Sequence, residues 1–308
     1  MNDPKTRRAA LECMIWAGAG VVWTVAGGVP RASLLGSAEA AEASFSFVQI
    51  SDSHIGFAKD PNMDTPGTLA EAINQIRALP QKPALLLQTG DVSHLSKPGQ
   101  FDIAEKIIGT AGLDAHFVPG EHDVLVDEAR PFVARFQARE KQGGADGGYY
   151  SFDQHGVHFI GLNNVTDLKA GGLGNLGAAQ LAWLQKDLAG RPASQPIVVF
   201  AHVPLWTVYA DWGWGTDDGA QALALLRRFG SVTVLNGHIH QVMQKIEGTV
   251  AFHTARSTAF PQPAPGTAPS PGPMKVEPGR LRTVLGTTEV RVVAGRAPLA
   301  IIDTPLAG

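Results

Sequence analysis

The sequence predicts an α/β fold with a largely parallel sheet, because two patterns alternate along the chain. Short apolar segments rich in β-formers recur, each bounded by Gly, Pro or Asn, as buried strands usually are. Between several of them, apolar residues repeat with the spacing of one helical face. Alternating strands and helices are typical of α/β proteins. The expected strands are 47–51, 84–89, 116–119, 157–162, 197–201, 232–235 and 250–254, and the expected helices are 68–79, 101–110, 128–141, 178–188 and 220–228.

The C-terminal part of the chain has a different composition. Residues 261–279 are dense in Pro, Gly and Ala, which predicts an extended loop rather than a helix or strand. The segments 282–285, 289–293 and 299–303 are expected to form antiparallel strands after that loop. Since neither an internal repeat nor a linker divides the chain after residue 43, we expect residues 44–308 to be one domain.

The N-terminal segment has the layout of an export signal. Arg7 and Arg8 precede an apolar, Gly/Ala-rich stretch at about residues 14–29, and a small-residue region runs to residue 43. The paired arginines resemble a twin-arginine signal, which implies contact with the export machinery. Residues 1–43 are therefore predicted to be an export signal cleaved near Ala41 or Ser44, leaving a periplasmic or secreted protein.

A membrane anchor is the alternative interpretation of this segment. A spanning helix needs about 20 apolar residues, and the stretch is shorter and contains several glycines. We therefore expect no stable membrane insertion of the mature chain.

Composition narrows the classes of partner and metal. The net charge of -3 argues against a generic binder of nucleic acid or anionic membranes, which would normally be basic. The only cysteine, Cys13, lies in the predicted signal, so a metal site in the mature protein must be built from His, Asp, Glu or Asn. Such ligands favour Fe, Mn, Zn, Ni or Mg over metals that prefer thiolates.

Acidic residues and histidines follow five of the expected strands directly. They are Asp52 and His54, Asp91, Glu121 and His122, His202, and His238 with His240. Loops at the carboxyl ends of strands in an open α/β sheet converge on one crevice, so these side chains should meet. Three carboxylates and five imidazoles crowded together would be poorly stable without cations, and two divalent metal ions would compensate them. Glycines at 90, 120 and 237 would let the backbone turn and keep Cβ atoms away from the metals.

These blocks resemble the pattern of the calcineurin-like metallophosphoesterases, which is D-x-H, G-D, G-N-H-D/E, H and G-H-x-H. All five blocks occur in that order between Asp52 and His240, a span that covers most of the mature chain. The branch that includes the class III cyclic-nucleotide phosphodiesterases is the most similar. The resemblance implies the αββα fold of this family, in which helices flank a central β-sandwich, and the hydrolysis of small phosphate esters.

The resemblance also implies a role for each residue. Asp52, His54 and His240 would bind the first metal ion, and Asp91 would bridge the two ions. The second ion would be bound by Glu121, His202 and His238. A hydroxide held between the metals would attack phosphorus, and His122 would stabilise the transition state or protonate the departing oxygen. Asp123 is a candidate to orient His122 through a ring nitrogen.

One position departs from the family pattern, since Glu121 replaces the usual Asn. If Glu121 ligates directly, as we expect, three carboxylates face the four charges of two divalent ions, and the centre is less positive. Such a centre favours a monoanionic phosphodiester over a dianionic monoester, and it suits a trivalent ion such as Fe³⁺ in one position. The predicted function is therefore dinuclear metal-dependent hydrolysis of phosphate esters, with phosphodiesters favoured.

Three alternatives remain open at this point. A phosphomonoesterase similar to the purple acid phosphatases would use the same ligands. A catalytically inactive scaffold would normally have lost ligands, whereas every ligand position here has a competent donor. A nuclease would need a basic stripe to follow the backbone, and the chain lacks one, so nucleic acid is not an expected partner.

Several further residues have both a functional and a structural interpretation. His253, Asn163, Asn164 and Arg256 could approach the site, whereas His94, His116, His155 and His158 are expected to be structural. The aromatic segment 206–215 could form a wall against a base or an apolar leaving group, or could hold its loop onto the core. Asp217 and Asp218 are expected to cap the helix that follows them.

Overall fold

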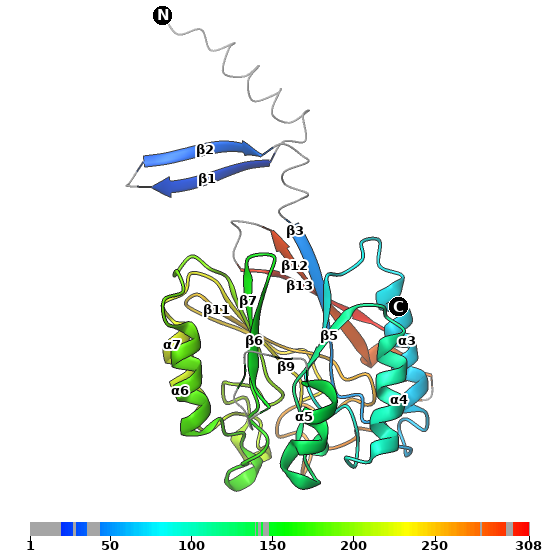
Figure 1. Ribbon diagram of the computed structural model, residues 1–308. Coiled ribbons are helices and arrows are strands. Elements are labelled where there is room, and N and C mark those ends of the chain that lie inside the picture. Colours follow the sequence, from blue (N-terminus) through cyan, green and yellow to red (C-terminus); the bar gives the residue numbers. More distant parts are fainter. Residues whose placement is uncertain are drawn as a thin grey trace, which may run out of the picture.

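Two β-sheets lie face to face, and helices cover the outer face of each (Figure 1). This computed structural model describes residues 44–307 except 139, 141–142, 144–147, 278 and 294–297, together with the backbone of 20–26 and 29–35. The order of layers is helix, sheet, sheet, helix. It confirms the predicted α/β fold with a central β-sandwich flanked by helices.

The first sheet has five strands in the order β13-β12-β3-β4-β5. Their bounds are β3 Ser44–Ile50, β4 Leu85–Gln88, β5 Asp114–Phe117, β12 Gly286–Val293 and β13 Ala300–Pro305. Strands β3, β4 and β5 are parallel, whereas β12 and β13 run antiparallel to their neighbours. The helices on its outer face are α3 Thr65–Arg77, α4 Pro98–Gly109 and α5 Arg130–Phe136.

The second sheet has six strands in the order β10-β11-β9-β8-β7-β6. Their bounds are β6 Tyr150–Gln154, β7 Val157–Gly161, β8 Ile197–Phe200, β9 Val232–Asn236, β10 Gln244–Glu247 and β11 Val250–Thr254. Strands β7, β8, β9 and β11 are parallel, and the two edge strands are antiparallel. Helices α6 Gly177–Leu188 and α7 Gly219–Leu226 cover its outer face.

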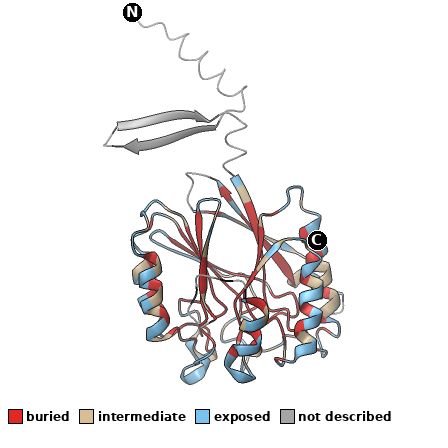
Figure 2. Cartoon of the chain, viewed as in Figure 1, coloured by how far each residue is buried: buried red, intermediate tan, exposed pale blue. Residues whose placement is uncertain are grey.

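The burial of apolar side chains explains this arrangement. Phe47 of the first sheet and Phe159 of the second are fully buried between the sheets, with ring centroids 5.3 Å apart. On helix α3, Leu69, Ile73 and Ile76 face the first sheet at helical spacing, and the opposite face is partly buried or exposed. Figure 2 shows the same alternation throughout, with buried residues in the strands and exposed residues on the outer helix faces.

The C-terminal part confirms some predictions and corrects others. Among the described residues of 261–279 there is neither helix nor strand, as expected for the Pro-rich loop. The predicted strand 282–285 is wrong, because Leu281–Val284 forms the short helix α8. Leu281, Val284 and Leu285 are spaced for one helical turn, so the apolar residues fit either structure. The sequence patterns also missed β6 and the exposed edge strand β10.

The cap predicted at Asp217 and Asp218 is confirmed in position but not in bonding. Asp218 occupies the N-cap position of α7 but makes no side-chain capping bond to it. Its carboxylate instead accepts hydrogen bonds from the backbone N–H groups of Leu176 and Gly177, at 2.9 and 2.8 Å. Asp218 therefore satisfies donors at the start of α6, a neighbouring helix.

The segment predicted to be an export signal, residues 1–43, lies outside the described residues except for the backbone of two strands. These are β1 Gly20–Ala26 and β2 Val29–Leu35, which pair antiparallel. Within the part of the chain that the structure describes, no helix combines the length and apolar character required to cross a membrane.

Candidate metal centre

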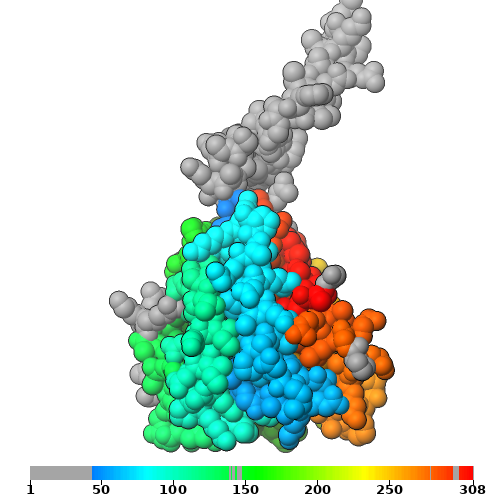
Figure 3. Space-filling view, turned by 90° about the vertical axis from the view of Figure 1, so that its right-hand side faces the viewer, coloured from blue at the N-terminus to red at the C-terminus, as the bar shows by residue number. Residues whose placement is uncertain are grey.

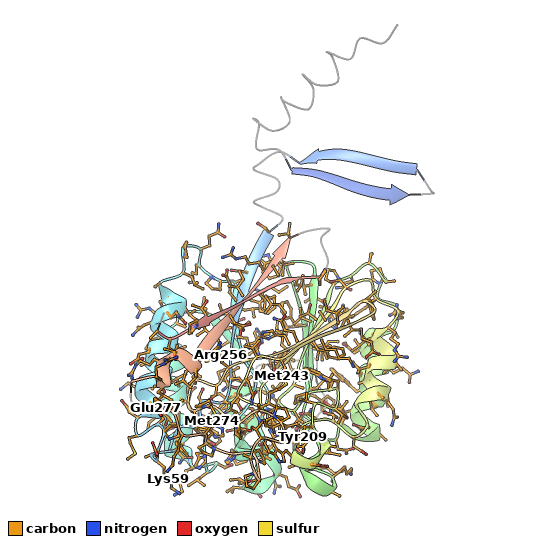
Figure 4. All side chains as sticks on the ribbon, turned by 180° about the vertical axis from the view of Figure 1, so that it is seen from behind. Lys59, Tyr209, Met243, Arg256, Met274 and Glu277 are labelled. Carbon is orange, nitrogen blue, oxygen red and sulfur yellow. The ribbon has the colours of Figure 1, made fainter. Side chains whose placement is uncertain are left out.

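The residues predicted to share a site lie in loops at one end of the sandwich. The loops after β3, β4, β5, β8 and β9 carry them, which is the end to which the parallel strands point. Tyr209 and Met274, labelled in Figure 4, lie toward this end of the molecule, at the bottom of the view. The topology therefore brings together residues that are separated by nearly 190 positions.

Asp52, His54 and His240 form the first group of donors. The Nε2 atom of His240 lies 3.2 Å from Asp52 Oδ1 and 3.3 Å from His54 Nε2. All three side chains are buried, and their donor atoms are close enough to hold one cation. The structure thus groups the three residues predicted for the first metal.

Glu121, His202 and His238 form the second group. Glu121 Oε2 lies 2.9 Å from His202 Nε2, and Glu121 Oε1 lies 3.0 Å from His238 Nδ1. The contact to His202 lacks hydrogen-bond geometry, so His202 Nε2 has no hydrogen-bond partner among the described residues, and neither has His238 Nε2. Buried imidazole nitrogens without a partner are costly, and a cation held by this group would satisfy them.

Asp91 connects the two groups. Its Oδ2 atom lies 3.4 Å from His54 Nε2 and 3.5 Å from His202 Nε2, so one oxygen lies between a donor of each group. Its Oδ1 atom accepts a hydrogen bond of 2.9 Å from the backbone N–H of His122. This is the placement expected for a carboxylate shared by two cations.

Hydrogen bonds to carbonyl groups orient two of the imidazoles. His202 Nδ1 lies 2.7 Å from Thr89 O, and His240 Nδ1 lies 2.5 Å from Phe260 O. Because a carbonyl oxygen can only accept, the proton of each ring is on Nδ1. Each Nε2 atom is then the ring nitrogen that faces the donor groups, as in a metal-ligating histidine.

The charge states of two donors also suit metal binding. Burial, assisted by His240 and His122, holds the pKa of His54 well below its usual value, so the ring is neutral. Burial alone would raise the pKa of Glu121, but His238 and His202 outweigh it and hold that pKa well below the usual range. A neutral imidazole and an ionised carboxylate are the forms that bind a metal ion.

The backbone is strained at most of these positions. Asp52, His54, Asp91, His238 and His240 have φ values of 53°, 41°, 53°, 69° and 55°. The left-handed conformation costs a residue with a Cβ atom about 1–2 kcal/mol. Such strain persists where the surrounding structure determines it, and it clusters at functional sites.

The three glycines predicted to make room for the site do so. A Cβ atom on Gly90 would lie 2.3 Å from His202 Nδ1, and one on Gly120 would lie 2.1 Å from Asp91 Oδ1. On Gly237 it would lie 2.6 Å from Asp52 Oδ2. Each glycine therefore allows the backbone to approach a proposed ligand more closely than any other residue could.

His122 lines the cavity above the donor groups, as expected for a residue beside the metals. Its Nδ1 atom lies 2.8 Å from the carbonyl oxygen of His94, to which it donates. Burial alone would lower the pKa of His122, but Asp91 and Glu121 outweigh burial and raise it. A protonated His122 can donate a proton to a departing oxygen.

Asp123 does not orient His122, which corrects that prediction. Its buried carboxylate accepts hydrogen bonds from Val92 N at 3.0 Å, Ser93 N at 2.8 Å and Gly120 N at 3.1 Å. Ser93 Oγ donates a fourth, at 2.9 Å. Asp123 therefore joins the loop after β4 to the loop after β5, the loops that carry Asp91 and Glu121.

His94 was predicted to be structural, but the structure places it in the site. Its Nδ1 atom lies 3.3 Å from His54 Nδ1, and its ring stacks on His122 with centroids 4.7 Å apart. It also lines the cavity. The sequence feature that could have identified His94 as a site residue is its position three residues after Asp91, in the same strand-end loop.

The remaining four candidates occupy structural positions away from the donor groups. His253 pairs with Asp303 at 2.9 Å, and Asn164 donates to Val203 O at 2.8 Å. Arg256 donates to Thr283 O at 3.1 Å, and Asn163 Nδ2 donates to Thr166 Oγ1 at 2.7 Å. None of these four residues lines the cavity over the donor groups.

The aromatic segment 206–215 contacts both the core and the cavity. Trp206 packs on Phe252 with ring centroids 4.9 Å apart, which holds that part of the loop onto the core. Trp212 and Trp214 line the cavity. The structural interpretation is thus confirmed for Trp206, whereas contact of Trp212 or Trp214 with a substrate stays a prediction.

Comparisons with known proteins agree with this geometry. The family model of the calcineurin-like phosphoesterases matches residues 45–242. The chain is 25% identical over 222 residues to a 3′,5′-cyclic-nucleotide phosphodiesterase of Nostoc sp., covering 70% of this chain and 79% of that protein. It is 26% identical over 180 residues to a glycerophosphodiester phosphodiesterase of Enterobacter lignolyticus, covering 56% of this chain and 62% of that protein.

A solved structure shares the fold. A dimetal phosphatase of Danio rerio superposes with a TM-score of 0.61 at 16% identity, covering 84% of this chain and 98% of that one. The family model covers more than half of the sequence, and the same stretch contains all the donor residues described above. The chain therefore belongs to the calcineurin-like phosphoesterase family and is a metal-dependent hydrolase of phosphate esters.

Proposed function

We propose that this protein hydrolyses phosphodiesters at a centre of two metal ions. The proposed ligands are Asp52, His54, Asp91, Glu121, His202, His238 and His240. The observation that carries the proposal is Asp91 Oδ2, which lies within 3.5 Å of a donor in each of the two groups. Two cations side by side would bind phosphoryl oxygens and lower the pKa of water, which is the chemistry that this reaction needs.

Residues of the chain itself would complete the reaction. His122 is held by the carbonyl of His94 and by its own backbone N–H to Asp91, so its ring has a fixed position beside the donor groups. Protonated, it would donate to the oxygen that leaves phosphorus, a step that contributes about 10²–10⁴-fold in such enzymes. Asp123 would act indirectly, by fixing the loops that carry Asp91 and Glu121.

Two features favour a diester over a monoester. Glu121 adds a third carboxylate to the donor groups, which lowers their attraction for a phosphate dianion. No Lys or Arg is among the residues that line the cavity in the described part of the chain. A second negative charge on the substrate would therefore have no cationic side chain to pair with. Both relatives named above are phosphodiesterases, which agrees with this preference.

The test compares two substrates with the same leaving group. Metal-loaded protein is assayed with bis-p-nitrophenyl phosphate, a diester, and with p-nitrophenyl phosphate, a monoester. The proposal predicts a higher kcat/KM for the diester, by about tenfold or more. A higher value for the monoester would indicate a phosphomonoesterase instead. Activity on neither, with two metal ions bound, would indicate an inactive scaffold.

We further propose that the protein is exported by the twin-arginine route. The support is the sequence of residues 1–43, with Arg7 and Arg8 ahead of an apolar stretch and a small-residue region. The test is to replace Arg7 and Arg8 with Lys and to follow the protein by cell fractionation and N-terminal sequencing. Export predicts a wild-type chain that begins near Ala41 or Ser44 outside the cytoplasm, and a variant that stays inside. If the wild type and the variant are distributed equally between the cytoplasm and the outside, the twin-arginine route is refuted.

A further inference from the structure

The cavity above the metal centre is bounded by aromatic and apolar groups. Its volume is about 240 Å³, and beyond the proposed ligands it is lined mainly by rings and prolines. The contributing residues include Trp212, Trp214, Phe260, Pro271 and Pro273. A substrate phosphate at the donor groups would therefore place one of its substituents against this apolar surface.

The loop that carries Trp212 is built to hold the ring in place. The backbone of the loop is closed by hydrogen bonds between Tyr209 and Trp214 at 3.0 and 3.1 Å. Gly213 has φ 71°, and a Cβ atom there would lie 2.7 Å from Gly171 O, so only Gly fits this turn. Trp214 is fully buried and meets the Trp212 ring edge to face, with centroids 5.0 Å apart. Trp212 itself is only partly buried.

The Pro-rich loop is fixed to the same site. Gln241 Nε2 donates to Gln262 O at 3.1 Å, and Gln262 Nε2 donates to the carbonyl of His238 at 3.2 Å. Met274 N donates to Pro261 O at 2.8 Å, which closes the loop that carries Pro271 and Pro273. In Figure 3 the orange surface of this region lies beside the blue segment that follows β3. A hydrogen bond of 2.7 Å from Asn62 Nδ2 to Ala259 O connects the two segments.

The two loops also approach each other. A Cβ atom on Gly266, in the Pro-rich loop, would lie 3.3 Å from Tyr209 Oη in the aromatic loop. Tyr209 in turn meets Trp212 edge to face, with centroids 5.3 Å apart. The apolar surface of the cavity is thus a structured wall, because each of its parts is packed or hydrogen-bonded to a neighbour.

We propose that Trp212 is a specificity-determining residue, which packs against an aromatic ring carried by the phosphodiester substrate. The proposal rests on the function proposed above and names its substrate class: diesters with an aryl or nucleobase-bearing substituent. Two features support it, namely the partly exposed Trp212 ring and the absence of a cationic side chain from the described lining. Stacking of a ring on an aromatic side chain is sufficient to discriminate it from a small alkyl group.

The test uses two non-hydrolysable probes, methyl(phenyl)phosphinate and dimethylphosphinate, as competitive inhibitors of the metal-loaded enzyme. Both probes are monoanions, as a phosphodiester is, and they differ only in the ring. Wild-type protein is expected to bind methyl(phenyl)phosphinate about tenfold more tightly, which corresponds to about 1.4 kcal/mol. Trp212→Ala should reduce this ratio to about twofold or less by weakening the binding of methyl(phenyl)phosphinate alone. Trp212→Phe, which keeps a ring, should give a ratio between those of the wild type and Trp212→Ala.

Trp183→Ala provides the matched control. Trp183, on helix α6, is partly buried like Trp212. Its ring packs beside Tyr149, and it does not line the cavity. This variant should keep the wild-type ratio. If Trp212→Ala does not fold, as judged by thermal unfolding, Trp212→Gln is compared in its place, since Gln retains more side-chain volume than Ala and has no ring.

The outcomes separate this proposal from the function on which it rests. Hydrolysis of bis-p-nitrophenyl phosphate is measured on the same sample. If the enzyme hydrolyses it but the inhibitor ratio is near one, or is unchanged in Trp212→Ala, the role of Trp212 is refuted and the diesterase function stands. If metal-loaded protein hydrolyses no phosphate ester, the proposed function itself is refuted.

Discussion

Gly120→Ala tests the geometry of the metal centre with the smallest possible change. The added Cβ atom would lie 2.1 Å from Asp91 Oδ1 and 2.3 Å from the backbone N of Asp91. Contacts below 3.0 Å do not occur for real Cβ atoms, so Asp91 or its loop must move by nearly 1 Å. Gly120 has φ -100°, a value open to alanine, so backbone strain does not add to the effect.

The expected magnitude follows from this displacement. Overpacking of this kind typically costs about 1–3 kcal/mol of stability. The larger effect should be on function, because a shift of about 1 Å in a catalytic group can reduce the rate by about 10²-fold. The displaced Asp91 would also lose its 2.9 Å hydrogen bond from His122 N. We therefore predict a folded protein with weakened metal binding and kcat/KM reduced about 100-fold.

The assay combines elemental analysis, urea unfolding and kinetics with bis-p-nitrophenyl phosphate. Gly109→Ala is the control, since nothing lies within 4 Å of the Cβ position at the end of α4. That variant should keep the activity and metal content of the wild type. If Gly120→Ala also binds two metal ions per chain and keeps its activity within about threefold, the placement of Asp91 between the two groups is wrong.

Three further substitutions test separate parts of the account. Glu121→Asn should leave a more positive centre and raise the preference for p-nitrophenyl phosphate relative to the diester, whereas an unchanged ratio would show that Glu121 does not set the charge. Asp123→Ala should lower the free energy of unfolding in urea by about 3–5 kcal/mol, because it leaves four buried donors without an acceptor. A loss below about 1 kcal/mol would contradict the role of Asp123 in joining the two loops. His94→Phe keeps the stacking on His122 but removes the nitrogen beside His54, and should lower kcat/KM by about 10–100-fold without unfolding the protein. Wild-type kinetics in that variant would make His94 a structural residue.

The sequence predicted the site better than it predicted the details of the fold. Asp52, Asp91 and His202 each follow a buried strand, and the carboxyl ends of parallel strands must lie at one edge of a sheet. Their convergence therefore followed from local patterns alone. The glycines beside them were predictable for the same reason, since a tight approach to a ligand requires the smallest residue.

Roles that depend on tertiary partners were not predictable. Asp123 is adjacent to His122 in sequence, yet its carboxylate faces the backbone of another loop. His94 belongs to the site because of its distance from His54, which no periodic pattern encodes. The edge strand β10 is exposed throughout, so it lacks the apolar alternation that marks a buried strand.

The central claim is that two cations lie between the donor groups, joined by Asp91. The most direct measurement is an anomalous diffraction map from a crystal of metal-loaded protein, with the wavelength set to the metal found by elemental analysis. Two peaks are expected about 3.5–4 Å apart, one beside Asp52 and His240 and one beside Glu121 and His202, with Asp91 between them. A single peak, or peaks distant from Asp91, would contradict it.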